Sequence, residues 1–102
     1  MKAGLLIGLL LSLLFQGTLM AGEDPPYTFV LVHGSSGGGW DWRTMDEILT
    51  AEGHTVYRPT LTGLGERVHL SSPDIDLSTH IDDIVNVIVF ESLQDIDVVG
   101  HS

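Results

Sequence analysis

The sequence predicts an α/β fold in which three strands alternate with two helices in the order β-α-β-α-β around a mostly parallel sheet. Short apolar, β-branched runs alternate along the chain with longer segments whose apolar residues recur at helical spacing. Strands that alternate with helices in this way are typically parallel and are joined by right-handed helical crossovers. The working loops of such a sheet lie at the carboxyl ends of its strands, so the residues that follow each strand are the first candidates for a functional site.

Three segments have the composition of strands. Residues 27–32 are apolar almost throughout, which is typical of a strand buried on both faces of a parallel sheet. Residues 54–58 form the second predicted strand, which Pro59 ends because proline cannot donate to the ladder. Residues 95–99 form the third.

The first predicted helix starts near Trp40 and ends at Gly53, a residue suited to a left-handed cap. Its apolar residues share one face: Trp42, Met45, Ile48 and Leu49.

The second predicted helix begins at a capping box formed by Thr79 and Asp82. Residues 84–90 are so rich in β-branched side chains that, taken alone, they could form a strand. The cap and the alternating order of elements favour a helix. Between the second strand and this helix, residues 60–72 are predicted to be a loop.

The N-terminus has the features of a secretory signal. Lys2 precedes an apolar run, and small residues suited to signal peptidase follow it. We therefore expect a signal peptide at residues 1–21, a linker at 22–26 and the folded domain at 27–102. A secreted or periplasmic location follows, with no stable insertion in a membrane after cleavage. An uncleaved anchor is the less favoured alternative, because polar and glycine residues interrupt the run.

The excess of acidic residues indicates which classes of partner the protein is not expected to bind. Acidic residues outnumber basic ones fourteen to four, for a net charge of −10, and there is no cysteine. Nucleic acids and anionic membranes need a basic surface, so neither is an expected partner. Without disulfides, the stability of the domain must come from a hydrophobic core.

The glycine-rich segment His33–Gly39 follows the first strand. Gly34 and Gly39 have the spacing of a phosphate-binding loop, but Trp40-Asp41 stands where its lysine and hydroxyl residue would be. A dinucleotide-binding loop has its glycines at other positions, and Pro59-Thr60 stands where its acidic residue would be. The third possibility is an oxyanion loop, whose backbone N–H groups stabilise negative charge during acyl transfer. The N–H of Ser35 would then be the first donor.

The last predicted strand leads into Gly100-His101-Ser102. This is the first half of a Gly-x-Ser-x-Gly nucleophile elbow, in which a serine stands on a sharp turn after a strand. Ser102 is therefore the candidate nucleophile, at the same sheet edge as the glycine loop.

Five motifs follow one another along the chain: Tyr27-Thr28-Phe29-Val30-Leu31-Val32-His33-Gly34, Gly38-Gly39-Trp40-x-Trp42, Pro59-Thr60-Leu61-Thr62-Gly63-Leu64-Gly65-Glu66-Arg67, His80-Ile81-Asp82-Asp83-Ile84-Val85 and Val98-Val99-Gly100-His101-Ser102. Together these motifs resemble the N-terminal part of the α/β-hydrolase superfamily. The resemblance is strongest to the branch of small esterases that includes plant methylesterases, hydroxynitrile lyases and their bacterial esterase relatives. It implies that Ser102 is the nucleophile, that Ser35 supplies an oxyanion donor, and that His33-Gly34 is the turn that positions it.

The resemblance implies a serine hydrolase that acts on small carboxylic esters, without a metal or cofactor. In this fold the histidine and acid of the triad follow the serine in chain order, so the 102-residue chain by itself is expected to be an inactive N-terminal part. We interpret His54, His69 and His80 as surface or packing residues. Two alternatives stay open, a non-catalytic protein that binds a small ligand and an enzyme of the hydroxynitrile lyase type.

Overall fold

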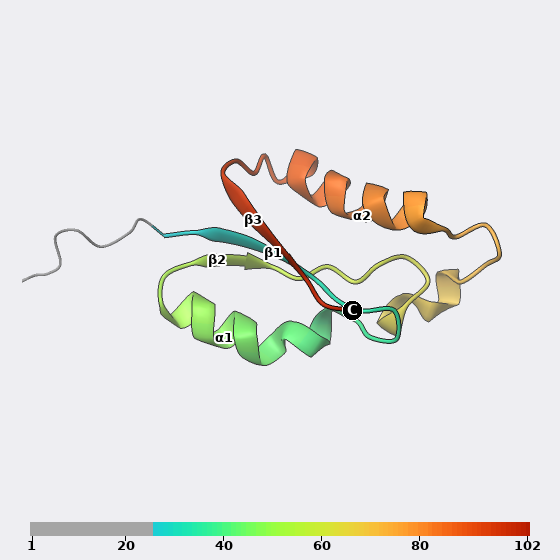
Figure 1. Ribbon diagram of the computed structural model, residues 1–102, viewed down its shortest axis with the longest axis horizontal. Helices are drawn as coiled ribbons and strands as arrows, with labels where there is room; N and C mark the ends of the chain where they lie inside the picture. Colours follow the sequence, from blue (N-terminus) through green and yellow to red (C-terminus); the bar gives the residue numbers. More distant parts are fainter. Residues whose placement is uncertain (1–25) are drawn as a thin grey trace, which may run out of the picture.

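Three parallel strands form the centre of the molecule (Figure 1). The computed structural model describes residues 26–102. Strand β1 (Thr28–Val32) lies between β2 (Thr55–Tyr57) and β3 (Ile96–Gly100), so the strand order is β2-β1-β3. The predicted order of elements and the parallel sheet are confirmed. The predicted signal peptide lies outside the described residues, as does most of the predicted linker.

The core lies on the central strand. Because β1 is hydrogen-bonded on both edges, its middle residues are shielded on both sides within the sheet. Val30 and Leu31 point to opposite faces and are the most buried side chains, with 0% and 1% of their surface exposed. This confirms the prediction that the middle of the first strand is buried on both faces.

Helix α1 (Arg43–Ala51) follows a short 3-10 helix, η2 (Gly39–Trp42). The predicted left-handed cap is confirmed at Gly53, whose φ is +96°. Its N–H donates to the carbonyl of Thr50, and the N–H of His54 reaches back to the carbonyl of Leu49. Glycine adopts this φ without the steric cost that a Cβ would add.

Helix α2 (Leu77–Phe90) confirms that the β-branched run is helical, but the predicted capping box was wrong. The N-cap is Asp76, whose Oδ1 accepts the N–H of Thr79 at 3.1 Å. Thr79 Oγ1 accepts the N–H of Asp76 at 3.4 Å in return. Aspartate is a better N-cap than threonine, so the box forms three residues earlier than predicted and Thr79 takes the third helical position.

The predicted loop at residues 60–72 also contains structure that the sequence analysis missed. Residues Gly65–Leu70 form the short 3-10 helix η3. It is closed by tight turns, such as the bond from the N–H of Arg67 to the carbonyl of Leu64 at 2.8 Å. Glycines at the start of the segment favoured a loop prediction, whereas side-chain contacts described below hold it in a helical turn.

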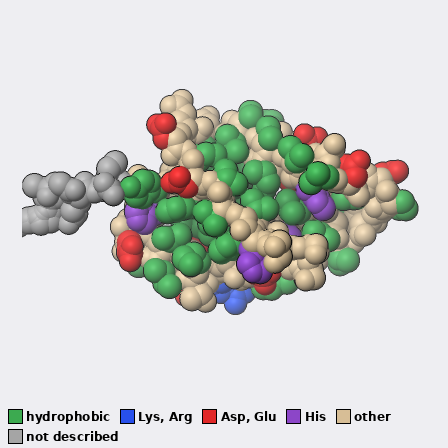
Figure 2. Space-filling view, in the orientation of Figure 1, with side chains coloured by type: hydrophobic (Ala, Val, Ile, Leu, Met, Phe, Trp, Pro, Cys, Tyr) green, Lys and Arg blue, Asp and Glu red, His purple; other side chains and the backbone are tan. Residues whose placement is uncertain are grey.

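The two helices lie on opposite sides of the sheet (Figure 1). Helix α2 exposes an apolar face. Hydrophobic side chains form a band across the surface over β3 and α2 (Figure 2). No helix within residues 26–102 is long and apolar enough to cross a membrane. The exposed apolar residues of these elements are Leu77, Ile81, Val85, Val89, Phe90, Val98 and Val99.

Residues 26–102 expressed alone are expected to aggregate. The apolar face of α2 and the unpaired outer edge of β3 are both open to solvent in this segment, and each is a surface on which chains associate. Light scattering and binding of an apolar dye to the purified segment measure this. A monomeric segment with a sharp, cooperative thermal transition would contradict the prediction.

Candidate functional site

The glycine loop after β1 touches the end of β3. A Cβ placed on Gly34 would lie 3.3 Å from the carbonyl oxygen of His101 and 3.5 Å from the carbonyl carbon of Ser102. The N–H of His101 donates to the carbonyl of Val32 at 3.0 Å, which continues the β1–β3 ladder past Gly100. The two loops that the sequence placed at one sheet edge are therefore in contact, and only a residue without a side chain fits easily at this point.

A cavity of about 380 Å³ lies at this edge. Ser35 and Ser102 both line it, together with His33, Gly34 and His101. The structure thus brings the predicted nucleophile and the predicted oxyanion residue to one space, while Gly100 lies just behind it as the last residue of β3.

His33 joins the loop to the segment that follows β2. Its side chain is buried, with 3% exposed. Nε2 accepts the N–H of Leu61 at 3.0 Å, and Nδ1 lies 2.7 Å from the carbonyl oxygen of Gly34. An acceptor at Nε2 and a donor at Nδ1 together define a neutral ring with its hydrogen on Nδ1. Both ring nitrogens are engaged, so His33 has a structural role and is not free to act as a base.

A tight turn presents Ser35 to the cavity. The N–H of Gly37 donates to the carbonyl of Gly34 at 3.1 Å and closes the turn. Ser35 lies at its exposed corner. Within residues 26–102 the backbone N–H of Ser35 donates to no other group.

His101 lies beside a second, smaller cavity. This space of about 170 Å³ is lined by Asp41 and Trp42 as well as by His33, Gly34 and His101. The rings of Trp42 and His101 meet edge to face at 6.4 Å. The indole Nε1 of Trp42 is buried without a partner among the described residues. The residue before the candidate nucleophile is therefore packed against the start of α1.

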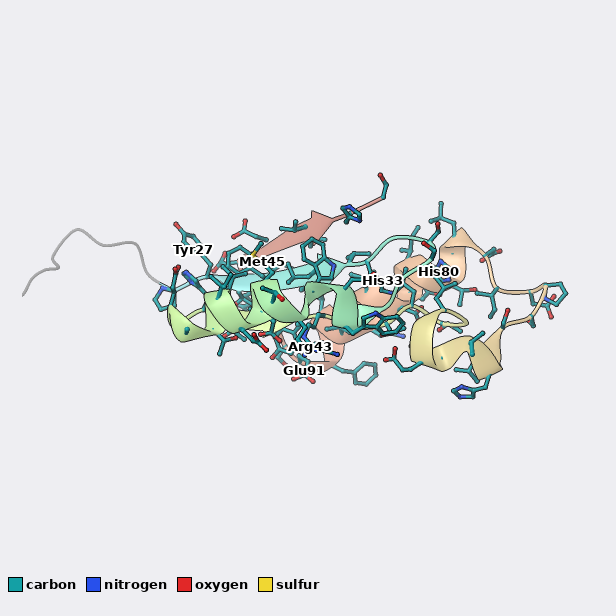
Figure 3. The ribbon with its side chains drawn as sticks, turned by 90° about the horizontal axis from the view of Figure 1, so that it is seen from below. Tyr27, His33, Arg43, Met45, His80 and Glu91 are labelled. Atoms are coloured by element: carbon teal, nitrogen blue, oxygen red, sulfur yellow. The ribbon has the colours of Figure 1, made fainter. Side chains whose placement is uncertain are left out.

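Three further residues of the main cavity escaped the sequence analysis: Leu61, Leu64 and His80. Figure 3 shows His33 and His80 side by side at this end of the molecule. His80 Nε2 donates to the carbonyl of Thr62 at 3.0 Å, a structural contact that agrees with its interpretation as a packing residue. Leu61 could have been found from the sequence, because it follows β2 and the functional loops of a parallel sheet lie at the carboxyl ends of its strands. No local sequence pattern marks His80. It lies in the first turn of α2, and its place at the cavity depends on how that helix packs.

The other two histidines agree with their interpretation as packing and surface residues. His54 Nδ1 accepts the N–H of Tyr27 at 2.9 Å, and its ring packs edge to face on Phe29. His69 is exposed on η3. No group of three or more metal-ligating side chains occurs within residues 26–102.

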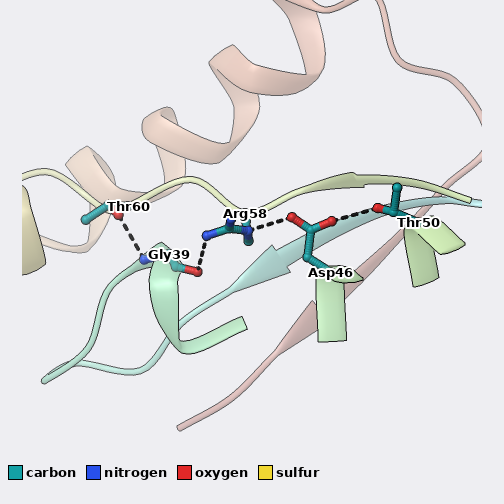
Figure 4. A network of polar contacts seen from close by, with 5 residues as sticks. All are labelled: Gly39, Asp46, Thr50, Arg58 and Thr60. Atoms are coloured by element: carbon teal, nitrogen blue, oxygen red, sulfur yellow. Dashed lines mark hydrogen bonds and ion pairs between the residues drawn. The ribbon is translucent and has the colours of Figure 1, made fainter. Parts of the chain in front are cut away.

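A polar network fixes the end of the glycine loop to α1 and β2 (Figure 4). Arg58 donates from Nε to Asp46 Oδ2 at 2.6 Å and from Nη1 to the carbonyl of Gly39 at 3.2 Å. Thr50 donates to Asp46 Oδ1 at 2.7 Å. The hydrogen bonds from Arg58 and then from Thr50 hold the pKa of Asp46 below its ordinary value of 3.8.

The lowered pKa of Asp46 predicts a loss of stability in acid. A carboxyl group whose pKa is lower in the folded than in the unfolded state contributes its full stabilisation above pH 3.8. That contribution is lost as the pH falls through the folded-state pKa. Asp46→Asn is expected to lower the free energy of unfolding at neutral pH by about 0.2–1 kcal/mol and to weaken its dependence on pH below 3.8. Urea unfolding of both proteins from about pH 2 to about pH 7 measures this. Parallel pH curves for the two proteins would contradict it.

Comparison with known proteins agrees with this geometry. A family model described as alpha/beta hydrolase family matches residues 29–102. A carbendazim hydrolyzing esterase from Nocardioides sp. (strain SG-4G) is 49% identical over 74 residues, which cover 72% of this chain and 31% of that protein. Methylesterase 8 from Arabidopsis thaliana is 39% identical over 59 residues, which cover 58% of this chain and 22% of that protein.

A solved structure gives the same result for the fold. It is an extracellular alpha/beta-hydrolase from a Paenibacillus species, described as sharing structural and functional homology with tobacco salicylic acid binding protein 2. The TM-score is 0.68 at 32% sequence identity, over 76% of this chain and 31% of the other. The chain thus spans about a third or less of the length of these relatives. With the parallel sheet, the glycine turn and the serine at the end of β3 in place, the matches show that this chain belongs to the alpha/beta hydrolase family.

Proposed function

We propose that the protein is a serine esterase of small carboxylic esters, in which Ser102 is the nucleophile. The observation that carries the proposal is the common cavity of Ser102 and Ser35, one with a hydroxyl group and the other with an unused backbone N–H. A nucleophile and an N–H donor on residues of one cavity are the minimum that acyl transfer requires.

The reaction follows from this arrangement. Ser102 Oγ attacks the ester carbonyl carbon and gives its proton to a histidine base. The negative charge that forms on the carbonyl oxygen is stabilised by the N–H of Ser35 and by the N–H of the residue after the serine. The tetrahedral intermediate expels the alcohol, which takes the proton from the histidine. Water then attacks the acyl-serine by the reverse sequence and releases the acid.

The base is proposed to be a histidine that follows Ser102 in the complete enzyme, as in the order typical of this fold. Two of the three histidines that line the cavity support this assignment by their contacts. Both nitrogens of His33 are engaged, and Nε2 of His80 is bound to the carbonyl of Thr62.

The lining of the cavity supports a small ester as the substrate. Leu61 and Leu64 give it an apolar wall, suited to the acyl or alkyl part of such a molecule. The names of two relatives, a methylesterase and a carbendazim hydrolyzing esterase, support methyl esters and carbendazim as the first compounds to test. We also propose that the protein is exported, in keeping with its predicted signal peptide and with an extracellular structural relative.

The test uses the protein as its gene produces it, with methyl esters of small acids and with carbendazim. Release of the alcohol and the acid, lost in Ser102→Ala, is the expected result. No turnover of any ester, with the same compounds still bound in a calorimetric titration, would replace the proposal with small-ligand binding. Cleavage of a cyanohydrin to a carbonyl compound and cyanide, without ester hydrolysis, would replace it with a lyase.

A further inference from the structure

We propose that Thr60, oriented by Glu66, positions the oxyanion loop by holding its far end. Both are positioning residues, since neither lines the cavity where the chemistry would occur. The inference rests on the proposed esterase function for its effect on catalysis, whereas its structural part is independent of that function.

Both ends of the loop are bound to two adjacent residues. At its start, His33 Nε2 accepts the N–H of Leu61 at 3.0 Å. At its end, the N–H of Gly39 donates to Thr60 Oγ1 at 2.8 Å (Figure 4). The segment Thr60–Leu61 is therefore a common support for both ends of a loop that carries Ser35 between them.

Glu66 determines how the hydroxyl of Thr60 is oriented. Thr60 is buried, with 6% exposed, and its Oγ1 donates to Glu66 Oε2 at 2.7 Å. A hydroxyl has one hydrogen, so donation to Glu66 leaves its lone pairs for the N–H of Gly39. Arg67 in turn donates to the carbonyl of Thr60 at 2.8 Å. The short helix η3 thus holds Thr60 through two side chains, which gives a role to a segment that the sequence predicted to be a plain loop.

The loop needs such a support because of its composition. Gly37, Gly38 and Gly39 are consecutive, and glycine has the widest backbone freedom of any residue. All three are buried, and the bond to Thr60 fixes the last of them. Release of that bond would let the chain between His33 and Trp40 sample more conformations, and the N–H of Ser35 would move with it.

The expected catalytic effect is on kcat. Loss of one oxyanion donor costs about a hundredfold to a thousandfold in kcat, so displacement of the Ser35 N–H is expected to cost about tenfold to a hundredfold. KM is expected to change less than about threefold, because the donor acts on charge that forms in the transition state.

The experiment compares Thr60→Val with Thr60→Ser and with Thr62→Val. Valine has the shape of threonine without the acceptor, and serine restores the hydroxyl. Thr62→Val is the matched control, two residues along the chain from Thr60. The Oγ1 of Thr62 donates to Asp83 Oδ1 at 2.7 Å and makes no hydrogen bond to the glycine loop. Amide hydrogen exchange at Gly38 and Gly39 is measured in each protein, with kcat and KM for a methyl ester.

The expected result is faster exchange at these two glycines and a lower kcat in Thr60→Val alone, with Thr60→Ser near wild type. Unchanged exchange in Thr60→Val, or equal changes in Thr62→Val, would overturn the inference. If Thr60→Val does not fold, Glu66→Ala takes its place, with the same expected direction and the same overturning result. A wild-type protein without ester turnover would count against the proposed function, while the exchange data would still decide whether Thr60 fixes the loop.

Discussion

Replacement of Ser102 by alanine is expected to reduce ester hydrolysis about ten-thousandfold or more, to the background of the assay. Without Oγ no acyl-enzyme forms, and the remaining N–H donors can stabilise only the direct attack of water on the bound ester. Because Ser102 is exposed at the end of β3, the substitution removes one hydroxyl and leaves the cavity walls in place. Initial rates with a methyl ester give the effect, and binding of the acid product gives a check that the site is intact.

Ser36→Ala is the matched control for this variant. Ser36 lies beside Ser35 on the same exposed turn but does not line the main cavity. Its hydroxyl has no role in the proposed chemistry, so its variant is expected to keep wild-type kinetics within about twofold. Hydrolysis by Ser102→Ala at an undiminished rate would assign the nucleophile to another residue.

Substitution of Gly39 by alanine is expected to give the largest loss of stability among single changes in the glycine loop. A Cβ at this position would overlap the backbone carbonyl of Arg58 and press on Thr60 Oγ1, 3.2 Å away. Backbone cannot move aside as the end of a flexible side chain can, so the loop or β2 must shift. Such overpacking costs about 1–3 kcal/mol, and here it would also strain the hydrogen bonds of Gly39 to Thr60 and Arg58.

Comparison of the free energies of unfolding of Gly39→Ala and Gly53→Ala in urea separates the cost of the steric clash from the cost of replacing a glycine. A methyl group at Gly53 meets nothing within 4 Å, so its cost is that of the left-handed backbone alone, about 1–2 kcal/mol. Gly39→Ala is also expected to lower kcat, because the loop that carries Ser35 ends at this residue, whereas Gly53→Ala is expected to leave kcat unchanged. Equal kcat values for the two variants would contradict the account of the loop.

The order of elements could be predicted because each one has a local signal. Residues 27–32 are apolar almost throughout, Gly53 suits a left-handed cap, and the run at 84–90 follows a capped helical start. The start of the second helix was predicted wrongly because two residues could cap it. Both Asp76 and Thr79 are suitable N-caps, and the structure uses Asp76, the residue type with the stronger preference for that position. The 3-10 helix at Gly65–Leu70 was missed for another reason: its side chains are held by Thr60, which precedes the helix in the chain, and no periodicity within the segment records these contacts.

The candidate site, like the fold, was predictable from the sequence only in part. Ser35 and Ser102 could be brought together from sequence, since the carboxyl ends of adjacent parallel strands meet at one edge. The structure confirms that the two loops meet, since a Cβ on Gly34 would lie 3.3 Å from the carbonyl oxygen of His101. The place of His80 depends on how α2 is attached through Thr62, and the support at Thr60 depends on a hydroxyl orientation. Neither follows from spacing along the chain.

The most direct test of the central claim is the reaction of the protein, as its gene produces it, with an active-site phosphonate. A phosphonate bonds to a serine hydroxyl that a base activates, and peptide mass spectrometry then locates the adduct. We predict one adduct per chain, on Ser102, formed more slowly when a methyl ester competes for the cavity. No adduct on Ser102, or an adduct on Ser35 or Ser36 instead, would contradict the assignment of Ser102 as the nucleophile.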